Sequence, residues 1–362
     1  MNGAAPVDAL QTTGAVLQGV DGRINLRSIA PSFLAQFLPE EVAEAHLRAK
    51  PLFGYAPTEG TPVLRARIAE AAGVHPDAVV VTDGASQAIF LLLLAGLKPG
   101  STVLIPRPAF PAYLRIAAYR GCKVRFYDWR ADGTDLLERL HAPDSRMIDA
   151  IIVNSPHNPT GIALDTAGRD RVAAALAQMT QLTILDDTYC WLDGPVGRIT
   201  HFGSFAQARS RTIGLAAVGS LGKLLCLPGL RLGFIVIHDR ALRDAIVEAK
   251  RHLVQASCSA SEHLAAALLV SAEWLEGRNN LLTALDQRRR EFETVMPPGV
   301  RPVSDGRGFY AYASAIAPLI ALGIDGVDGT VFEGAADAAR YCLAASSEDW
   351  SRFNAVIGGA GT

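Results

Sequence analysis

The sequence predicts an α/β fold, a three-layer sandwich around a mostly parallel seven-stranded sheet, with a smaller α+β domain attached. The first observation is a series of short, continuous apolar runs that alternate with helical patterns, near residues 78–82, 103–105, 124–127, 150–153, 182–185, 212–218 and 232–237. Continuous apolar strands are typical of sheets buried on both faces, and their alternation with helices favours parallel pairing. The second observation is that the chain becomes helical after Arg240 and mixes short strands with helices beyond Pro298.

These patterns divide the chain into three parts. Residues 46–280 hold the seven strands and form the large domain, and residues 281–362 form the small C-terminal domain. Residues 1–45 form an N-terminal segment that we expect to join the small domain, and a short helix is expected near 39–49. In a sheet of this kind, functional loops are expected at the carboxyl ends of the strands.

The composition excludes several classes of function. The 362 residues carry a formal net charge of −2, which leaves no basic footprint for nucleic acid and no polybasic patch for a membrane. The first residues lack the pattern of a signal peptide, and the longest apolar run, residues 88–97, is too short to cross a bilayer. The five cysteines form no C-x-x-C pair and are odd in number, so we expect a reduced, cytoplasmic protein.

A glycine turn follows the first strand. Gly84 permits a tight turn, and Ala85 and Ser86 begin a helix whose free backbone amides can bind an anion, most commonly phosphate. An ordinary strand-to-helix loop would have the same sequence features. The assignment of this turn as an anion site therefore depends on the other motifs.

Two later turns carry polar side chains. Asn158, in the run NSPHNPTG, can direct a fixed amide into a cleft, although Asn-Pro-Thr-Gly also favours a plain turn. Asp186 leaves an apolar strand directly, where an unpaired carboxylate is costly, so we expect it to have a cationic partner. A structural ion pair is the alternative. Tyr189, about one turn further on, directs a phenol towards the same region.

The run GSLGKLLCLPGLRLGF, residues 219–234, is the stretch around which the other motifs are organised. Lys223 follows an apolar strand in a turn of small residues, and Arg231 lies eight positions later. Only Lys223 is expected between apolar strands, where desolvation lowers the basicity of an amine enough for attack on a carbonyl. The other four lysines are expected in turns or on a polar helix: Lys50, Lys98, Lys123 and Lys250.

Together these loops offer an anion cradle, neutral hydrogen-bond donors, a carboxylate and an amine, which is the set that pyridoxal 5′-phosphate needs. In its HNPTG, DDTY and Lys-to-Arg motifs the chain resembles the fold type I pyridoxal-phosphate-dependent aminotransferases, the class I/II (aspartate aminotransferase-like) family. The resemblance covers nearly the whole chain. It implies the fold type I PLP-transferase architecture, pyridoxal 5′-phosphate as cofactor, and transfer of an amino group from an L-amino acid to a 2-oxo acid.

The resemblance also implies a role for each motif residue. Lys223 matches the lysine that forms a Schiff base with the cofactor and then moves a proton at the substrate's α-carbon. Asp186 matches the partner of the pyridine nitrogen, while Asn158 and Tyr189 match the residues that hydrogen-bond the phenolic oxygen. The residues that match phosphate contacts are Ala85, Ser86, Ser220 and Arg231.

Further matches concern the ring, the substrate and a second subunit. Phe110, in PRPAFPAY, matches the aromatic residue stacked on the cofactor ring, with Tyr113 as a close alternative. Arg340, in ARYCLA, matches the arginine that binds the substrate carboxylate, with Asn158 beside it. Tyr55, in GYAPTEG, matches a tyrosine that reaches the neighbouring subunit's cofactor, which implies a homodimer. A solvated helical arginine and a surface tyrosine are the alternatives. No metal ligand is expected.

Departures from the family pattern leave the reaction open. Gly222 replaces the usual serine before the lysine, and the segment between Gly308 and Arg340 is shorter than the family norm. The alternative is therefore a non-transaminating enzyme of the same fold: a decarboxylase, lyase, cyclase or oxidase. Residues 257–261, SCSAS, lack the arginine of aspartate-specific members, which argues against a dicarboxylate substrate. A non-catalytic cofactor-binding module is a third interpretation, against which Lys223 argues.

Overall fold

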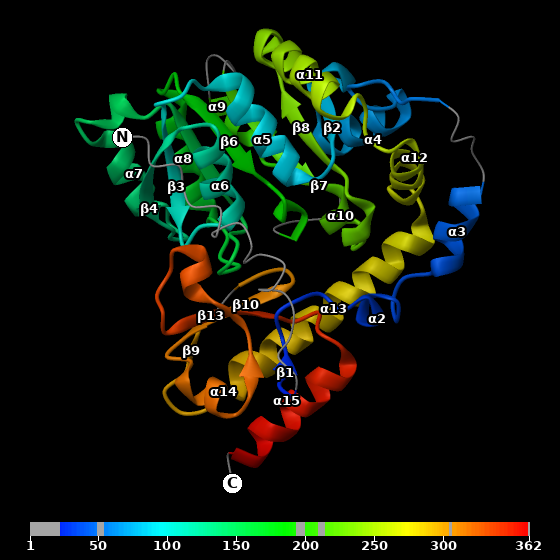
Figure 1. Ribbon diagram of the computed structural model, residues 1–362, viewed down its shortest axis with the longest axis vertical. Helices are drawn as coiled ribbons and strands as arrows, with labels where there is room; N and C mark the ends of the chain where they lie inside the picture. Colours follow the sequence, from blue (N-terminus) through cyan, green and yellow to red (C-terminus); the bar gives the residue numbers. More distant parts are fainter. Residues whose placement is uncertain (1–21, 49–53, 193–199, 209–213, 304–305, 361–362) are drawn as a thin grey trace.

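A computed structural model describes residues 22–48, 54–192, 200–208, 214–303 and 306–360. Figure 1 shows a large layered unit built on one sheet, a smaller unit beside it, and a long helix, α13 (Ala272–Thr294), that runs from one to the other.

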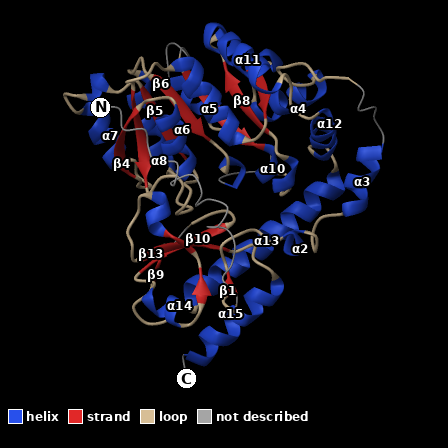
Figure 2. Ribbon diagram, in the orientation of Figure 1, coloured by secondary structure: helices blue, strands red, loops and turns tan. Residues whose placement is uncertain are grey.

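The large unit contains a seven-stranded sheet. Strand β8 runs antiparallel to both of its neighbours, and the other neighbouring strands are parallel (Figure 2). The predicted fold class is therefore confirmed. In sheet order the strands are β2 (Val79–Thr82), β8 (Gly233–Ile237), β7 (Leu215–Ser220), β6 (Leu182–Asp186), β5 (Ala150–Asn154), β3 (Thr102–Arg107) and β4 (Lys123–Asp128).

Helices cover both faces of this sheet because alternate strand residues are apolar on both sides. In β2, Val80 packs in one core cluster, while Val79 and Val81 pack in the other. The cluster around Val80 is covered by α5 (Ala85–Gly96), α6 (Pro111–Tyr119) and α11 (Arg240–Val254). The opposite cluster includes α4 (Pro62–Ala72), α7 (Thr134–His141), α8 (Thr166–Ala177), α9 (Phe202–Ala208) and α12 (Ser259–Leu268).

The smaller unit combines segments from both ends of the described chain. Its four-stranded antiparallel sheet has the order β12 (Val327–Asp328), β13 (Ala338–Cys342), β10 (Tyr310–Ser314) and β9 (Arg301–Pro302). Near it, β1 (Ile24–Asn25) pairs in parallel with β11 (Ile324–Asp325). The remaining helices are α2 (Pro31–Leu34), α3 (Glu40–Arg48), α14 (Ala317–Ala321) and α15 (Ser347–Ala360).

Buried contacts along α13 hold these segments together. The Arg288 guanidinium donates to the carbonyls of Leu343 and Ala345, both at 2.8 Å, and lies 3.8 Å from the centre of the Phe33 ring. Gly277 passes so close to the segment before α3 that a Cβ there would lie 2.3 Å from the Phe37 carbonyl oxygen. None of the helices in the described ranges has the length and apolar character needed to cross a membrane.

Short helical turns connect several of these elements. Two of them border the loops of the site: α10 (Leu221–Leu224) directly follows β7, and η5 (Pro228–Leu230) precedes β8. The others are η2 (Pro76–Ala78), η3 (Ser145–Met147), η4 (Cys190–Leu192) and η6 (Gly329–Phe332).

Candidate active site

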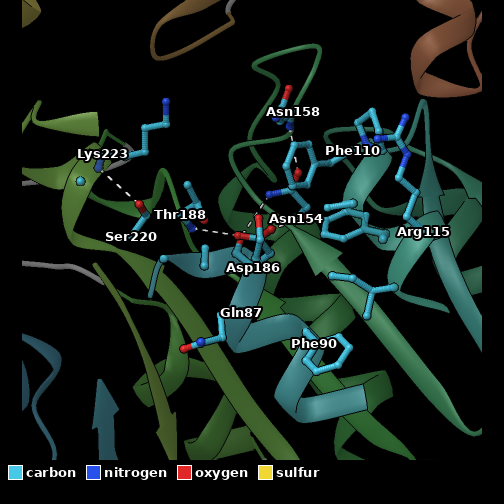
Figure 3. A pocket seen from close by; sticks show the side chains of 18 of the residues that line it. Gln87, Phe90, Phe110, Arg115, Asn154, Asn158, Asp186, Thr188, Ser220 and Lys223 are labelled. Carbon is cyan, nitrogen blue, oxygen red and sulfur yellow. Dashed lines mark hydrogen bonds between the residues drawn. The ribbon is translucent and has the colours of Figure 1, made fainter. Parts of the chain in front are cut away.

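A cavity of about 860 Å³ lies where the carboxyl ends of the large sheet face the smaller unit. The loops after β2, β5, β6 and β7 supply one wall, and β10, β12 and β13 supply residues of the other. Ten of the eleven predicted site residues line this cavity: Ala85, Ser86, Phe110, Asn158, Asp186, Tyr189, Ser220, Lys223, Arg231 and Arg340. Figure 3 shows several of them around one open space.

Asp186 ends β6 at the base of the cavity and is only 4% exposed. The Tyr113 hydroxyl donates to its Oδ2, and the Thr188 amide donates to its Oδ1 at 3.1 Å. Burial raises the pKa of this carboxyl, and the two hydrogen bonds oppose that rise. The described residues give Asp186 neutral donors and no cationic side chain, which argues against the alternative of a structural ion pair. Its carboxylate can therefore accept a cation from a bound ligand.

Tyr113 contacts Asp186, a position that the sequence did not predict for it. The sequence predicts it as an alternative to Phe110 for ring stacking, but it lies fully buried on α6 with its hydroxyl on Asp186. The Phe110 ring lines the cavity and contacts Tyr113 edge-on, with ring centres 5.5 Å apart. The available signal was the i, i+3 spacing of two aromatic residues at a helix start, which places both on one face.

The loop after β5 is held by Asn154, which sequence analysis did not single out. Its Oδ1 accepts from the Asn158 amide at 2.9 Å, and its Nδ2 donates to the Asp186 carbonyl at 3.1 Å (Figure 3). One side chain therefore links the ends of two neighbouring strands. Asn158 itself is buried, and the peptide bond to Pro159 is cis.

Arg340 brings the smaller unit into the site. Its Nη1 donates to Asn158 Oδ1 at 3.1 Å, across 182 positions of sequence. Its guanidinium lies 4.0 Å from the centre of the Tyr310 ring and 5.0 Å from that of Phe332. Arg340 Nε is buried and has no hydrogen-bond partner among the described residues. Arg340 lines the cavity, so its guanidinium is placed to meet an anionic ligand there.

Lys223 lies on α10, where the Ser220 hydroxyl accepts from its backbone amide at 3.3 Å. Its Nζ lies 5.5 Å from the centre of the Phe309 ring and 5.9 Å from that of Tyr310. Among the residues that the structure describes, it makes no hydrogen bond or ion pair through that ammonium. The amine is therefore available to a ligand.

The expectation that Lys223 alone is desolvated is wrong. Lys250, predicted on a polar helix, is fully buried, whereas Lys223 is partly exposed to the cavity. The sequence of this helix does not predict the burial of Lys250, because the segments that cover this residue are distant in the chain. Lys98 and Lys123 are exposed, although Lys123 begins strand β4 and does not lie in a turn, and Lys50 lies outside the described residues.

The residues of the predicted anion cradle, at the start of α5 and at Arg231, lie together at the cavity. Gly84 adopts a positive φ of 85° at the N-cap, and no side chain caps the helix. Arg231 Nη2 would lie 3.2 Å from a Cβ placed on Gly84, so the guanidinium lies beside this helix end. Ser220 lines the same cavity. A helix N-terminus beside a guanidinium is suited to a phosphate.

Tyr189 and Tyr55 differ in position. Tyr189 is buried on the cavity wall, and burial raises the pKa of its phenol well above the ordinary value. Tyr55 is 90% exposed and does not line the cavity of its own chain. Tyr55 is therefore the one predicted site residue that does not line the cavity, whereas the other ten do.

A buried polar cluster lies directly behind Asp186. Asp187 accepts from His201 Nδ1 at 2.9 Å, from the His201 amide at 2.7 Å and from the Thr200 hydroxyl. His201 Nε2 lies 3.5 Å from Cys190 Sγ. Asp187 therefore faces away from the cavity, which leaves Asp186 as the carboxylate of the site.

Comparisons with known proteins agree with this geometry. Human tyrosine aminotransferase is 29% identical over 218 residues, covering 56% of this chain and 46% of that protein. A 2-aminoadipate transaminase from Thermus thermophilus is 31% identical over 223 residues, covering 59% and 55%. The chain thus spans about half the length of the curated relatives it matches.

A solved Escherichia coli structure, of a protein described as having methionine aminotransferase function, shares the fold. Its TM-score is 0.77 at 19% identity, covering 96% of this chain and 97% of that one. The family model "Aminotransferase class I and II" matches residues 22–315. The resemblance predicted from the motifs is therefore confirmed, and this chain belongs to the aminotransferase class I and II family.

Proposed function

We propose that this protein is a pyridoxal-phosphate-dependent aminotransferase that moves an amino group from an L-amino acid to a 2-oxo acid. The observation that carries the proposal is the meeting of three groups in one cavity: the Lys223 amine, the Asp186 carboxylate and the anion cradle at Gly84. Members of the family use pyridoxal 5′-phosphate. An aldehyde, a ring nitrogen and a phosphate are the three features of that cofactor that these groups complement.

The cofactor fits a specific feature of the site. The buried carboxylate of Asp186 receives only neutral donors from the described residues, so a protonated ring nitrogen would supply the cation that it lacks. Ala85, Ser86, Ser220 and Arg231 would hold the phosphate, Asn158 and Tyr189 the phenolic oxygen, and Phe110 the ring face. When bound, the cofactor supplies an aldehyde for the amino group and a ring that withdraws electrons from the α-carbon.

The roles of the chain's own residues follow from these positions. Lys223 Nζ would be the amine that holds the cofactor through its aldehyde, and when free it would take the proton from the substrate's α-carbon and deliver it away from that carbon. Asp186, a buried carboxylate with neutral donors, would hold the ring nitrogen and favour its protonated form. Arg340, which lines the cavity, would bind the substrate carboxylate through its guanidinium.

We also propose that the amino-acid substrate carries an uncharged, apolar side chain. The cavity wall around Arg340 is formed by Tyr310, Val327, Val331 and Phe332. A charged side chain would lose its hydration there without gaining a partner. One observation favours a second candidate, a dicarboxylic amino acid, because Arg115 on α6 lines another part of the cavity.

The test is a panel of L-amino acids given to the cofactor-loaded protein without an acceptor. We expect one 2-oxo acid for each cofactor converted to its amine form, with phenylalanine, leucine or methionine exceeding aspartate, glutamate and 2-aminoadipate. Release of carbon dioxide, ammonia or a β-substituent instead would indicate the decarboxylase, lyase, cyclase or oxidase alternative. Preference for the acidic substrates would assign the specificity to Arg115.

We further propose a homodimer that acts in the cytoplasm. Support for the dimer is the 90% exposure of Tyr55, an aromatic side chain that a second subunit would cover at its own cofactor phosphate. Support for the location is that the cysteines are free thiols. Sedimentation of the purified protein tests the dimer, and a monomer at micromolar concentration would contradict it.

A further inference from the structure

We propose that Lys250 and Glu262 are positioning residues, which hold the loop of residues 54–61 so that Tyr55 reaches the cofactor phosphate of a partner subunit. The inference rests on the proposed function, because it requires both the cofactor and a second copy of the chain. It assigns a purpose to two buried ionisable groups that line no part of the cavity.

Lys250 lies near the end of α11 and is completely buried. Its Nζ donates to the Thr58 carbonyl at 2.6 Å, across 192 positions of sequence. Burial lowers the pKa of this ammonium, and the negative charges of Glu262, Asp83 and Glu59 oppose that change. An apolar side chain would occupy the place at less cost, so the lysine is explained by the contact that it makes with the loop.

Glu262, on α12, holds the same loop at its last residue, Thr61. It is also completely buried, and its Oε2 accepts from the Thr61 amide at 2.6 Å. Its Oε1 is buried without a hydrogen-bond partner among the described residues. The hydrogen bond from Thr61 and the charge of Lys250 both oppose the rise in the pKa of Glu262 that burial produces. The carboxylate and the ammonium therefore support each other and the loop.

A third attachment lies between these two. The Val81 amide, on β2, donates to the Glu59 carbonyl at 2.8 Å. Gly60 has a φ of +105°, and a Cβ there would lie 2.3 Å from Val81 Cγ2, so the loop is pressed against the strand.

Residues 58–61 are thus fixed one after another, while Tyr55, three residues earlier, is 90% exposed. Figure 1 shows α4, which follows the loop, together with α11 and α12 at one end of the large unit. Residues 58–61 are held in place, and the Tyr55 side chain next to them is exposed. This arrangement is suited to contact with a second molecule and not with the chain's own cavity.

The inference predicts an effect in trans. If the loop of one subunit is loosened, the cofactor should bind less tightly in the other subunit. This can be measured in hybrid dimers, in which a donor subunit carries Lys223→Ala and a reporter subunit keeps Lys223. Borohydride trapping at graded pyridoxal-phosphate concentrations, followed by mass analysis of the Lys223 peptide, reports occupancy of the reporter alone.

The expected result depends on which subunit carries Lys250→Met. In the donor, the substitution should raise the half-saturating cofactor concentration of the reporter by about tenfold, because a phosphate hydrogen bond is weakened. In the reporter, it should leave that concentration within about twofold of the hybrid without it. Lys98→Met, at an exposed lysine, is the matched control in either subunit.

Thr61→Pro gives a second route should Lys250→Met not assemble. Thr61 already has φ −62° and ψ 141°, which proline adopts, so the change removes the donor to Glu262 with little strain. Thr61→Ser keeps both the amide and the hydroxyl, which each contact Glu262, and is its control.

An effect that follows the reporter, or no difference between the hybrids, would overturn the positioning role. A wild-type reporter that traps no cofactor at any concentration would instead overturn the proposed function.

Discussion

Two adjacent aspartates at the end of β6 face opposite environments. Asp186 faces the cavity and receives Tyr113 and Thr188, whereas Asp187 is held by the amide and ring of His201. Side chains alternate between the two faces of a strand, so neighbours in sequence separate in space. This separation places Asp186 at the cavity, as the proposed function requires, and Asp187 in the buried cluster with His201.

Asp186→Asn should lower kcat/KM for amino-acid turnover at least about a hundredfold, about 2.7 kcal/mol, because the ring nitrogen loses its counter-charge. Asp187→Asn is the matched control. It should reduce thermal stability while leaving most of the turnover per folded molecule, since Asp187 bonds His201 and Thr200. Steady-state kinetics with melting curves test both. The reverse pattern would assign the ring nitrogen to Asp187.

The cofactor-free protein should show the cost of burying Asp186. Because burial raises the pKa of this carboxyl, the folded chain binds more protons than the unfolded chain at pH values just above about 4. Its contribution is therefore favourable at low pH and is lost as the pH rises through the folded-state pKa. The stability of Asp186→Asn relative to wild type should increase from pH 4 to neutral pH in urea unfolding. A difference that does not change with pH would contradict this.

At the scale of elements, the close approach of β8 to the start of α5 shapes the anion cradle. A Cβ on Gly233 would lie 2.6 Å from the Gly84 carbonyl carbon and 2.7 Å from the Ala85 nitrogen. Both are backbone atoms, which cannot rotate away as a side chain can. Glycine at this position of the strand is thus required by the helix start that it supports.

Gly233→Ala should weaken pyridoxal-phosphate binding at least about tenfold, about 1.4 kcal/mol, because the phosphate amides of α5 are displaced. Gly229→Ala is the control, since no atom lies within 4 Å of a Cβ placed there. Titration of the apoprotein with cofactor measures the effect. Equal affinity of the two variants would show that the cradle is not formed by this helix start.

The elements were predictable because each is encoded locally. The apolar runs gave all seven strands of the large sheet, and the polar residues at their ends gave most of the site. Pairings between distant segments were not predictable in this way. Tyr113 meets Asp186 across 73 positions, Arg340 meets Asn158 across 182, and Lys250 meets Thr58 across 192. No local pattern reports such contacts, so the role of Tyr113 and the burial of Lys250 were missed.

At the scale of the whole molecule, the cavity has walls from two units. The large unit supplies the predicted cofactor groups, and the smaller unit supplies Arg340, Tyr310 and Phe332. The Arg340–Asn158 hydrogen bond joins these walls directly. Substrate binding is therefore expected to depend on how the two units are held together by α13.

Arg340→Lys should lower kcat/KM for the amino acid about a hundredfold while leaving cofactor affinity unchanged, because an ammonium cannot form the two-pronged contact of a guanidinium. Arg301→Lys, at an exposed position of the same sheet, is the control. Kinetics over an amino-acid concentration series and a cofactor titration separate the two effects. Loss of cofactor binding in Arg340→Lys would place the guanidinium at the cofactor instead.

The most direct test concerns the covalent partner of the cofactor. The protein is incubated with pyridoxal 5′-phosphate, reduced with borohydride, digested and mapped by mass spectrometry. We predict one stoichiometric pyridoxyl-phosphate adduct, on the peptide that contains Lys223, and none in Lys223→Ala. A protein that stays unlabelled, or an adduct on another lysine such as Lys250, would contradict the account.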